Sequence, residues 1–336
     1  MKRSLVILFL ILVAASACNK EEELYNFVPE FEVFALFPSE GIGDRSFVDG
    51  VYEGIEKTTH HFNFKVNYII PDSLEAGNQW ISGIPELESD ISPAALIIVV
   101  GSQYTGAVEN LNGHYGKHYV LGLETTAAEQ EKLAQVTFHT YAPSYISGYI
   151  SAQKAAPCNA LVVAGFDAPF LTEYIDGFNQ GVLDAGGSVS PPEFVSSGFS
   201  GFEMPDSAYR LTNQLLPEHN LLFALSSGSN QGIINAARHY PEQRYVVGVD
   251  ADQSWMGLTV VTGSVIKQFD KVVFNCIEQF STGNFTSGNV VRSLEEGSTN
   301  FLMNEVVMGN TEIPEELIKN ALEKEKEFLN RPNQNF

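Results

Sequence analysis

Residues Ala95 to Val100 form an uninterrupted apolar run, which constrains the fold more than any other feature of this chain. A strand with no polar position is apolar on both faces, and such strands occur in parallel sheets that helices cover on both sides. From residue 32 onward, short β-branched or aromatic runs alternate with helical stretches. This alternation is the order of successive βα units, so the sequence predicts an α/β protein.

The predicted elements are more numerous than one open sheet usually holds, so we expect two doubly wound, Rossmann-like lobes with a ligand cleft between them. The predicted strands are 32–37, 65–70, 95–100, 118–123, 160–164, 220–226, 245–249 and 257–261, and the predicted helices are 46–58, 142–156, 169–185, 229–239, 264–280 and 315–329. The N-terminal lobe is predicted to comprise 31–141 and about 253–282, the C-terminal lobe 142–252 and about 283–322, and the C-terminal tail 323–336. In the helix 169–185, Gly177 and Gly181 would allow close approach to a sheet.

The N-terminus carries two cationic residues followed by the apolar run 5–14, which has the length of a secretory h-region and is too short to span a bilayer. Residues 1–17 are therefore predicted to be a signal peptide. Its small residues Ala-Ser-Ala stand directly before Cys18, which resembles the bacterial lipobox. This indicates lipidation of Cys18 and a lipidated tether over 18–30, whereas plain secretion with cleavage after Ala17 is the alternative.

The charge of the chain limits its partners. With 41 acidic and 19 basic residues, the formal charge is −22 at pH 7. Such an excess of carboxylates repels phosphate backbones and anionic headgroups. Nucleic acid is therefore excluded as a partner, and contact with a membrane is expected through the lipid anchor only.

Motifs for catalysis, cofactors or metals are not evident in the sequence. The turn 41–46 approximates a dinucleotide-binding loop, but a short loop that ends in a helix cap is favoured. His114 and His118 have no third ligand nearby, so surface histidines are favoured over a metal site. Cys158 and Cys276 are interpreted as free thiols rather than as a bridge. The chain is therefore predicted to be no enzyme and to bind neither a metal nor a cofactor.

Polar residues gather where predicted strands end. Asp44 follows the first strand, 226–228 follow a strand of the second lobe, and Asp250 with Asp252 follow another. In open parallel sheets, ligands bind beyond the carboxyl ends of the strands. These residues are therefore candidates for a ligand site, although Asp44 could instead cap the helix that begins at Ser46.

Five ordered blocks between residue 43 and about residue 270 carry a family resemblance. They are Gly43-Asp44-Arg45-Ser46-Phe47 with Tyr52 and Gly54; Tyr145-Ile146-Ser147-Gly148; Gly165 through Gly177-Phe178 and Gly181; Ser227-Gly228 through Gly232; and Val247 through Gln253 with Ser264-Val265-Ile266-Lys267. In this order they are similar to motifs of the basic membrane protein family of bacterial lipoproteins, known as purine-nucleoside receptors.

The resemblance implies the periplasmic-binding-protein type I fold and a ligand site at defined positions. By position, Asp44 and Tyr52 would lie in the ligand wall of the first lobe, Gly228 in the second lobe, and Asp250 and Lys267 near the hinge. Carboxylates accept hydrogen bonds from sugar hydroxyls, a tyrosine ring offers a face to a base, and a lysine donates to a ring atom. For Tyr52 a core role remains the alternative, and for Lys267 an exposed position on the helix 264–280.

The sequence departs from the family at two places. Val48 stands where the family usually has Asn, which would remove an amide able to bind a base edge. The acidic residue that the family carries after the fourth strand has no clear counterpart in the segment 121–124.

The resemblance implies a monomeric, lipid-anchored solute-binding protein of an ABC importer, held in the cell envelope. Its partners would be an ABC permease and a nucleoside or similar polar heterocycle. The alternative is a surface or periplasmic lipoprotein that uses the same scaffold for sensing or protein interaction without uptake. The acidic run Glu21 to Glu23 directly after Cys18 would suit the alternative.

Overall fold

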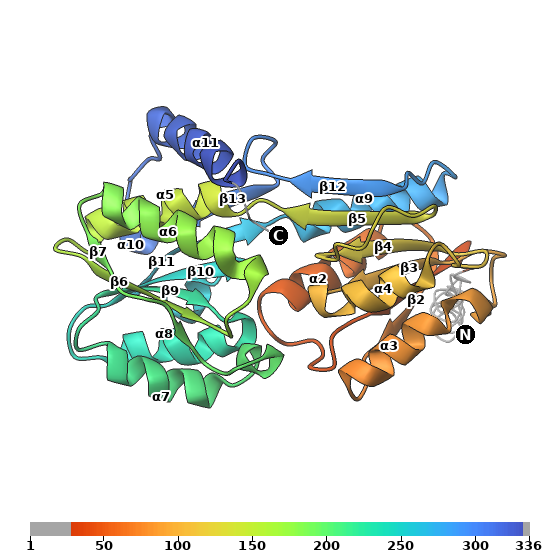
Figure 1. The fold of residues 1–336 in the computed structure, drawn as a ribbon, viewed down its shortest axis with the longest axis horizontal. Helices are drawn as coiled ribbons and strands as arrows, with labels where there is room; N and C mark the ends of the chain where they lie inside the picture. Colours follow the sequence, from red (N-terminus) through yellow and green to blue (C-terminus); the bar gives the residue numbers. More distant parts are fainter. Residues whose placement is uncertain (1–27, 332–336) are drawn as a thin grey trace, which may run out of the picture.

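The structure is a computed structural model that describes residues 28–331, so the predicted signal peptide and Cys18 lie outside the described residues. The chain forms two α/β lobes that lie side by side (Figure 1). Each lobe has its own sheet, built mainly from parallel strands. The predicted fold class is therefore confirmed.

The N-terminal lobe contains six parallel strands in the order β12-β5-β4-β3-β1-β2. Their bounds are β1 Phe31–Leu36, β2 Phe64–Ile69, β3 Leu96–Val100, β4 Tyr119–Leu123, β5 Leu133–Phe138 and β12 Gly288–Arg292, and the helices of this lobe are α2 Phe47–Thr59, α3 Leu74–Ser82, α4 Thr105–Leu111 and α9 Phe269–Ser281. Alternate residues of β3 enter two separate cores: Leu96, Ile98 and Val100 share one with α2 and α9, and Ile97 with Val99 share the other with α3 and α4. The apolar run 95–100 is thus buried on both faces, as predicted.

The C-terminal lobe contains the second sheet, in the order β13-β11-β10-β9-β6-β7, with β8 also paired to β6. The strands are β6 Asn159–Ala164, β7 Ser188–Val189, β8 Glu193–Phe194, β9 Leu221–Leu225, β10 Tyr245–Asp250, β11 Val261–Lys267 and β13 Thr299–Met303, and the helices are α5 Tyr141–Lys154, α6 Thr172–Asp184, α7 Pro205–Leu215, α8 Asn230–His239, α10 Glu305–Met308 and α11 Glu315–Leu329. The strand β13 is antiparallel to β11. As in the first lobe, one core lies on each face of the sheet.

Three crossing segments join the lobes: β5 to α5, β11 to α9, and β12 to β13. Hydrogen bonds join these segments to one another. The amide of His139 donates to Arg292 O at 2.8 Å, the Thr299 hydroxyl donates to His139 O at 3.2 Å, and the amide of Gln268 donates to Ser298 O at 3.0 Å. Adjacent crossing segments of this kind can act as a hinge between two rigid bodies.

The lobe boundaries differ from those predicted. Residues up to Lys267 belong to the sheet of the C-terminal lobe, because β11 pairs with both β10 and β13. The chain then returns to the first lobe, where β12 pairs with β5. The segment 323–329, predicted as part of a tail, belongs to α11, which packs on α5.

Two glycines of α6 make a closer contact than the sequence indicated, and with a different partner. A Cβ atom on Gly177 would lie 2.4 Å from Tyr141 O, and one on Gly181 would lie 2.1 Å from Tyr145 O. Both carbonyls belong to α5, so these glycines allow close helix–helix packing rather than the predicted approach to a sheet. This packing fixes α5, whose N-terminus faces the cleft, against α6.

Candidate functional site

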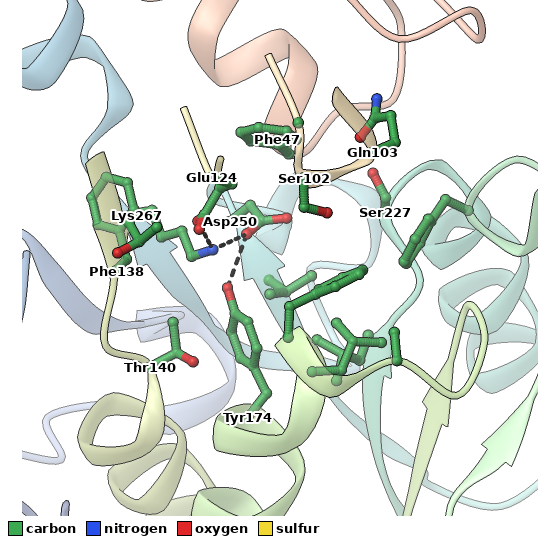
Figure 2. Close-up of a pocket in the computed structure, with 18 of the residues that line it drawn as sticks. Phe47, Ser102, Gln103, Glu124, Phe138, Thr140, Tyr174, Ser227, Asp250 and Lys267 are labelled. Atoms are coloured by element: carbon green, nitrogen blue, oxygen red, sulfur yellow. Dashed lines mark hydrogen bonds and ion pairs between the residues drawn. The ribbon is translucent and has the colours of Figure 1, made fainter. Parts of the chain in front are cut away.

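A cavity of about 750 Å³ lies between the lobes and is lined by residues of both and of the crossing segments (Figure 2). Its volume is in the usual range for small-molecule sites, which are concave and mostly apolar with a few polar groups. Its lining includes Asp44, Phe47, Val48, Ser102, Gln103, Glu124, Phe138, Thr140, Phe166, Phe170, Tyr174, Phe199, Phe202, Ser227, Asp250 and Lys267. Of the five predicted ligand-binding residues, three line this cavity: Asp44, Asp250 and Lys267.

Asp44 is buried in the loop between β1 and α2 and has every carboxylate oxygen occupied. The backbone amides of Ser46, Val48 and Asp49 each donate to it at 3.0 Å. The hydroxyl of Ser227, from the other lobe, also donates to it at 2.8 Å. Asp44 therefore caps α2, as the alternative interpretation predicted, and in addition it connects the two lobes.

Gly228 lies opposite Asp44 in the short 3-10 turn Ser227–Ser229. A Cβ atom on Gly228 would lie 3.1 Å from Phe202 O and 3.5 Å from the Asp44 Cα. An added Cβ would therefore crowd the Phe202 carbonyl and make an ordinary van der Waals contact with Asp44. The cavity is lined here by Ser227 and not by Gly228, and the tight contact of Gly228 is with Phe202 of its own lobe.

Asp250 ends β10 with a left-handed backbone, φ 66°, and contacts three side chains. One carboxylate oxygen accepts a hydrogen bond from the Tyr174 hydroxyl at 3.1 Å, and the other accepts one from the Ser46 hydroxyl at 2.8 Å. The Lys267 ammonium lies 3.9 Å away. Because Ser46 belongs to the first lobe, the Asp250 carboxylate also connects the lobes across the cleft.

Lys267 is the last residue of β11 rather than a helical residue, so the alternative of an exposed helix position is wrong. Its ammonium donates to Glu124 and is surrounded by the rings of Phe138, Tyr174 and Phe269, with centroids 5.2–5.8 Å away. Burial alone would lower the pKa of Lys267, but the negative charges of Glu124 and Asp250 outweigh it and raise this pKa. The ammonium is therefore charged, and Figure 2 shows it pointing toward Glu124 and Asp250.

Glu124 lines the cavity directly after the fourth strand, so the expectation that the segment 121–124 has no clear acidic counterpart there is wrong. It directly follows β4 and lies within hydrogen-bond distance of the Lys267 ammonium. Its position at the carboxyl end of a central parallel strand was the signal that could have identified it.

Tyr52 does not line the cavity. Its ring packs on Tyr68 of β2, with centroids 5.2 Å apart, and it borders the core of the first lobe. The expectation that Tyr52 offers its face to a ligand is therefore not met. The ring that α2 presents to the cavity is that of Phe47, the first residue of the helix.

Four phenylalanines of the C-terminal lobe form an aromatic wall on the other side of the cavity. They come from two loops, one after β6 and one that contains the turn Phe199–Phe202, and their ring centroids lie 4.9–6.3 Å apart. The members of this wall are Phe166, Phe170, Phe199 and Phe202. Aromatic walls of this kind accept flat rings by stacking or edge contacts.

Other sequence interpretations concern the rest of the described chain. Cys158 and Cys276 are free thiols, as predicted. Among residues 28–331, no group of three or more His, Cys, Asp or Glu side chains is arranged to hold a metal ion. No helix in that same range is long and apolar enough to cross a membrane.

Comparisons with known proteins agree on one family. A family model described as "ABC transporter substrate-binding protein PnrA-like" (Bmp) matches residues 31–332. Basic membrane protein D of Borreliella burgdorferi (strain JD1) is 22% identical over 309 residues, which is 90% of this chain and 87% of that protein. An uncharacterized lipoprotein of Pyrococcus abyssi is 22% identical over 308 residues, which is 89% of this chain and 75% of that protein.

The fold has solved relatives as well. The chain resembles a solute-binding protein of an ABC transporter system from Aeropyrum pernix K1 with a TM-score of 0.74 and 20% sequence identity. That match covers 88% of this chain and 86% of the other. At such an identity, the likeness shows the shared two-lobed fold.

Proposed function

Because the chain belongs to the family of PnrA-like ABC transporter substrate-binding proteins, as its sequence blocks indicated, we propose that it binds a nucleoside or a similar polar heterocycle between its lobes. In this proposal it delivers the bound molecule to an ABC permease and catalyses no reaction. One observation carries the ligand class: the interlobe cavity has an aromatic wall on one side and a cluster of carboxylates with a lysine on the other.

The two sides suit the two halves of such a ligand. A flat heterocycle would lie between Phe47 of the first lobe and the aromatic wall of the second. The hydroxyls of an attached sugar would donate to carboxylates, which in their ionised form only accept hydrogen bonds. We assign this role to Asp250, and its position in the cavity lining at the carboxyl end of β10 supports the assignment.

The proposal includes anchoring in the cell envelope through acylated Cys18. Support comes from the predicted signal peptide and from relatives named as basic membrane protein and lipoprotein. With a tether between Cys18 and the described body, the two lobes would stay near the membrane yet remain free to rotate.

A thermal-shift screen tests the ligand class directly, because a ligand that binds only the folded state raises the melting temperature by mass action. Nucleosides, free bases, sugars and amino acids form the panel, and calorimetry then gives the affinity. Saturable stabilisation by nucleosides is expected. If no small molecule of the panel binds saturably, the alternative of a protein-interaction lipoprotein is supported instead.

Replacing Asp250 tests the site. Asp250→Ala is expected to weaken binding by roughly 1.5–3 kcal/mol, the range for hydrogen bonds to a charged group. Asp252→Ala is the matched control, since Asp252 lies in the same loop, accepts a hydrogen bond from the Ser254 amide and does not line the cavity. Equal affinities of the wild type and a folded Asp250→Ala protein would remove Asp250 from the site.

A further inference from the structure

We propose that the cleft rejects phosphorylated and other anionic ligands, and that Glu124 determines this selectivity by neutralising Lys267. This inference rests on the proposed function in one respect, the choice of a nucleoside as the neutral ligand. The rejection of anions is argued from the cavity itself. It is carried by one arrangement: Lys267 and the N-termini of α2 and α5, three positive features at the cavity, are each already occupied by carboxylates of the chain itself.

The first positive feature is Lys267, the one Lys or Arg side chain among the described residues that line the cavity. Its ammonium donates to Glu124 and lies 3.9 Å from Asp250, so two negative charges face one positive charge. Three aromatic rings enclose the remaining sides, and the Lys267 side chain is only 9% exposed. A phosphate could reach this ammonium only by displacing a carboxylate.

The second positive feature is the N-terminus of α2. A helix N-terminus at the carboxyl end of a parallel strand is a common phosphate site, because its free amides and its dipole attract anions. Here three of these amides, those of Ser46, Val48 and Asp49, already donate to the Asp44 carboxylate. The place of a phosphate is taken by a residue of the protein.

The third positive feature is the N-terminus of α5 in the hinge. The amides of Thr140 and Tyr141 donate to Glu173 at 2.7 and 3.3 Å, and the amide of Ala142 donates to Glu325 at 2.9 Å. Glu173 also accepts from the ring of His139 at 3.0 Å. These three amides are therefore not available to an anion at this end of the cavity.

The balance of charge points the same way. Four acidic residues that line the cavity are buried or half-buried, namely Asp44, Glu124, Glu173 and Asp250. A phosphomonoester adds about −1.5 to −2 charges at pH 7, and like charges in a desolvated cleft repel one another. A neutral nucleoside avoids this repulsion and can still donate its hydroxyls to the same carboxylates.

Glu124 is singled out by its geometry. Its backbone is left-handed, φ 60°, which costs a non-glycine residue energy that the surroundings must offset. Glycine would adopt this conformation without strain. The presence of a strained glutamate therefore indicates that its carboxylate has a role at this position. Since Glu124 makes the direct hydrogen bond to Lys267, its removal should expose the ammonium to a ligand.

The test compares a nucleoside with its 5′-monophosphate by calorimetry in the wild type, Glu124→Gln and Glu40→Gln. The wild type should bind the monophosphate at least about 100-fold more weakly than the nucleoside. In Glu124→Gln, this ratio of the two affinities should fall about tenfold, because the released Lys267 ammonium can form a charge-assisted hydrogen bond to phosphate. Glu40→Gln is the matched control, since it removes a lining carboxylate that is not bonded to Lys267. The ratio of the two affinities in Glu40→Gln should stay within about threefold of the wild type, because Glu40 is exposed and solvent and salt screen its charge.

A second arm needs no nucleoside. Inorganic phosphate should stabilise Glu124→Gln saturably in thermal shift, but not the wild type and not the double variant Glu124→Gln with Lys267→Met, at matched ionic strength. If no nucleoside binds, the proposed function is refuted. The proposed selectivity is still supported in that case, provided that phosphate stabilises only Glu124→Gln in the thermal-shift experiment. The selectivity is overturned if the wild type binds the monophosphate as tightly as the nucleoside, if it is stabilised by phosphate, or if Glu40→Gln narrows the ratio as much as Glu124→Gln.

Discussion

Replacing Ser46 by alanine removes a hydroxyl that joins the two lobes across the cleft. The Ser46 hydroxyl is buried and donates to the Asp250 carboxylate at 2.8 Å, and it lies 3.2 Å from Val249 O. Ser46 is the N-cap residue of α2, but its side chain makes no capping hydrogen bond. The capping oxygens come from Asp44, so Ser46→Ala should leave the helix intact and affect the closed arrangement of the lobes.

The expected magnitude follows from the kind of bond. A hydrogen bond to a charged acceptor contributes about 1.5–3 kcal/mol, and each 1.4 kcal/mol is about a tenfold change in affinity. If the unliganded protein is mainly open, the bond exists only after closure, and its loss lowers the population of the binding-competent state. Ser46→Ala should therefore weaken ligand binding by roughly 10- to 150-fold.

Calorimetry with the ligand found in the screen measures the affinity, and urea unfolding of the unliganded protein measures the stability. Ser89→Ala is a closely matched control, because the Ser89 hydroxyl also donates to a buried carboxylate, that of Glu32, at 2.6 Å. Both partners of that bond lie in the N-terminal lobe. Ser89→Ala should therefore lower the free energy of unfolding and leave the affinity unchanged.

Two results would refute this reasoning. One is a folded Ser46→Ala protein with wild-type affinity, which would mean that the bond to Asp250 does not contribute to the bound state. The other is an equal loss of affinity in Ser89→Ala, which would mean that the loss reflects general destabilisation.

Four further changes have defined outcomes. Cys18→Ser should move the protein from the membrane to the soluble fraction of a cell extract, since acyl chains are its predicted anchor. Tyr52→Ala should cost about 1–3 kcal/mol of unfolding free energy, less than a fully buried ring, with unchanged ligand affinity. Glu32→Gln should lower stability at pH 7 in urea unfolding. Because hydrogen bonds, first among them that from Lys65, lower the pKa of Glu32 to about 2 against the effect of burial, this difference should shrink as the pH falls from about 5 towards 2. Trp255→Ala removes the exposed ring 5.4 Å from the Arg45 guanidinium of the other lobe, and should speed ligand dissociation about two- to fivefold in stopped flow, as for an exposed cation–π contact.

Each of these has an opposite result that would count against it. Unchanged membrane retention would remove Cys18 as the anchor, and a loss of affinity in Tyr52→Ala would return that residue to the ligand site. A constant stability gap between pH 7 and pH 3 would show that the Glu32 charge is not stabilising. An unaltered dissociation rate in Trp255→Ala would show that the contact with Arg45 does not hold the lobes together.

The local sequence pattern was sufficient to predict an element wherever its apolar residues recur with the period of a helix or a strand. The run 95–100 has no polar position, so the sequence alone predicted a central strand, and this strand is buried on both faces. Likewise α2 has a strand before it and an apolar stripe within it, so its bounds were predicted to within a residue. Asp44 and Asp250 were found because strand ends in parallel sheets converge at one edge.

The sequence alone did not predict elements whose bounds or positions depend on pairing with a distant segment of the chain. The segment 257–267 contains β-branched residues that suit a strand at more than one register, and only pairing with β10 and β13 sets β11 at Val261–Lys267. Because of this pairing, Lys267 is the last residue of a strand and is largely buried, whereas the sequence predicted it within the helix 264–280. The strand β12 has exposed valines and no strong pattern, and its place beside β5 depends on the return of the chain to the first lobe.

The sequence by itself determined the α/β class, the two lobes, most strands and helices, the family and the carboxylates at the strand ends. These follow from hydrophobic periodicity and short motifs, which act over a few residues. Only the tertiary structure decided that Phe47 and not Tyr52 faces the cavity, that four phenylalanines from two loops form its wall, and that Glu124 pairs with Lys267. The physical reason is that these contacts join residues far apart in the chain, such as Glu124 and Lys267, whose side chains meet only after both sheets have formed and the lobes have closed on each other.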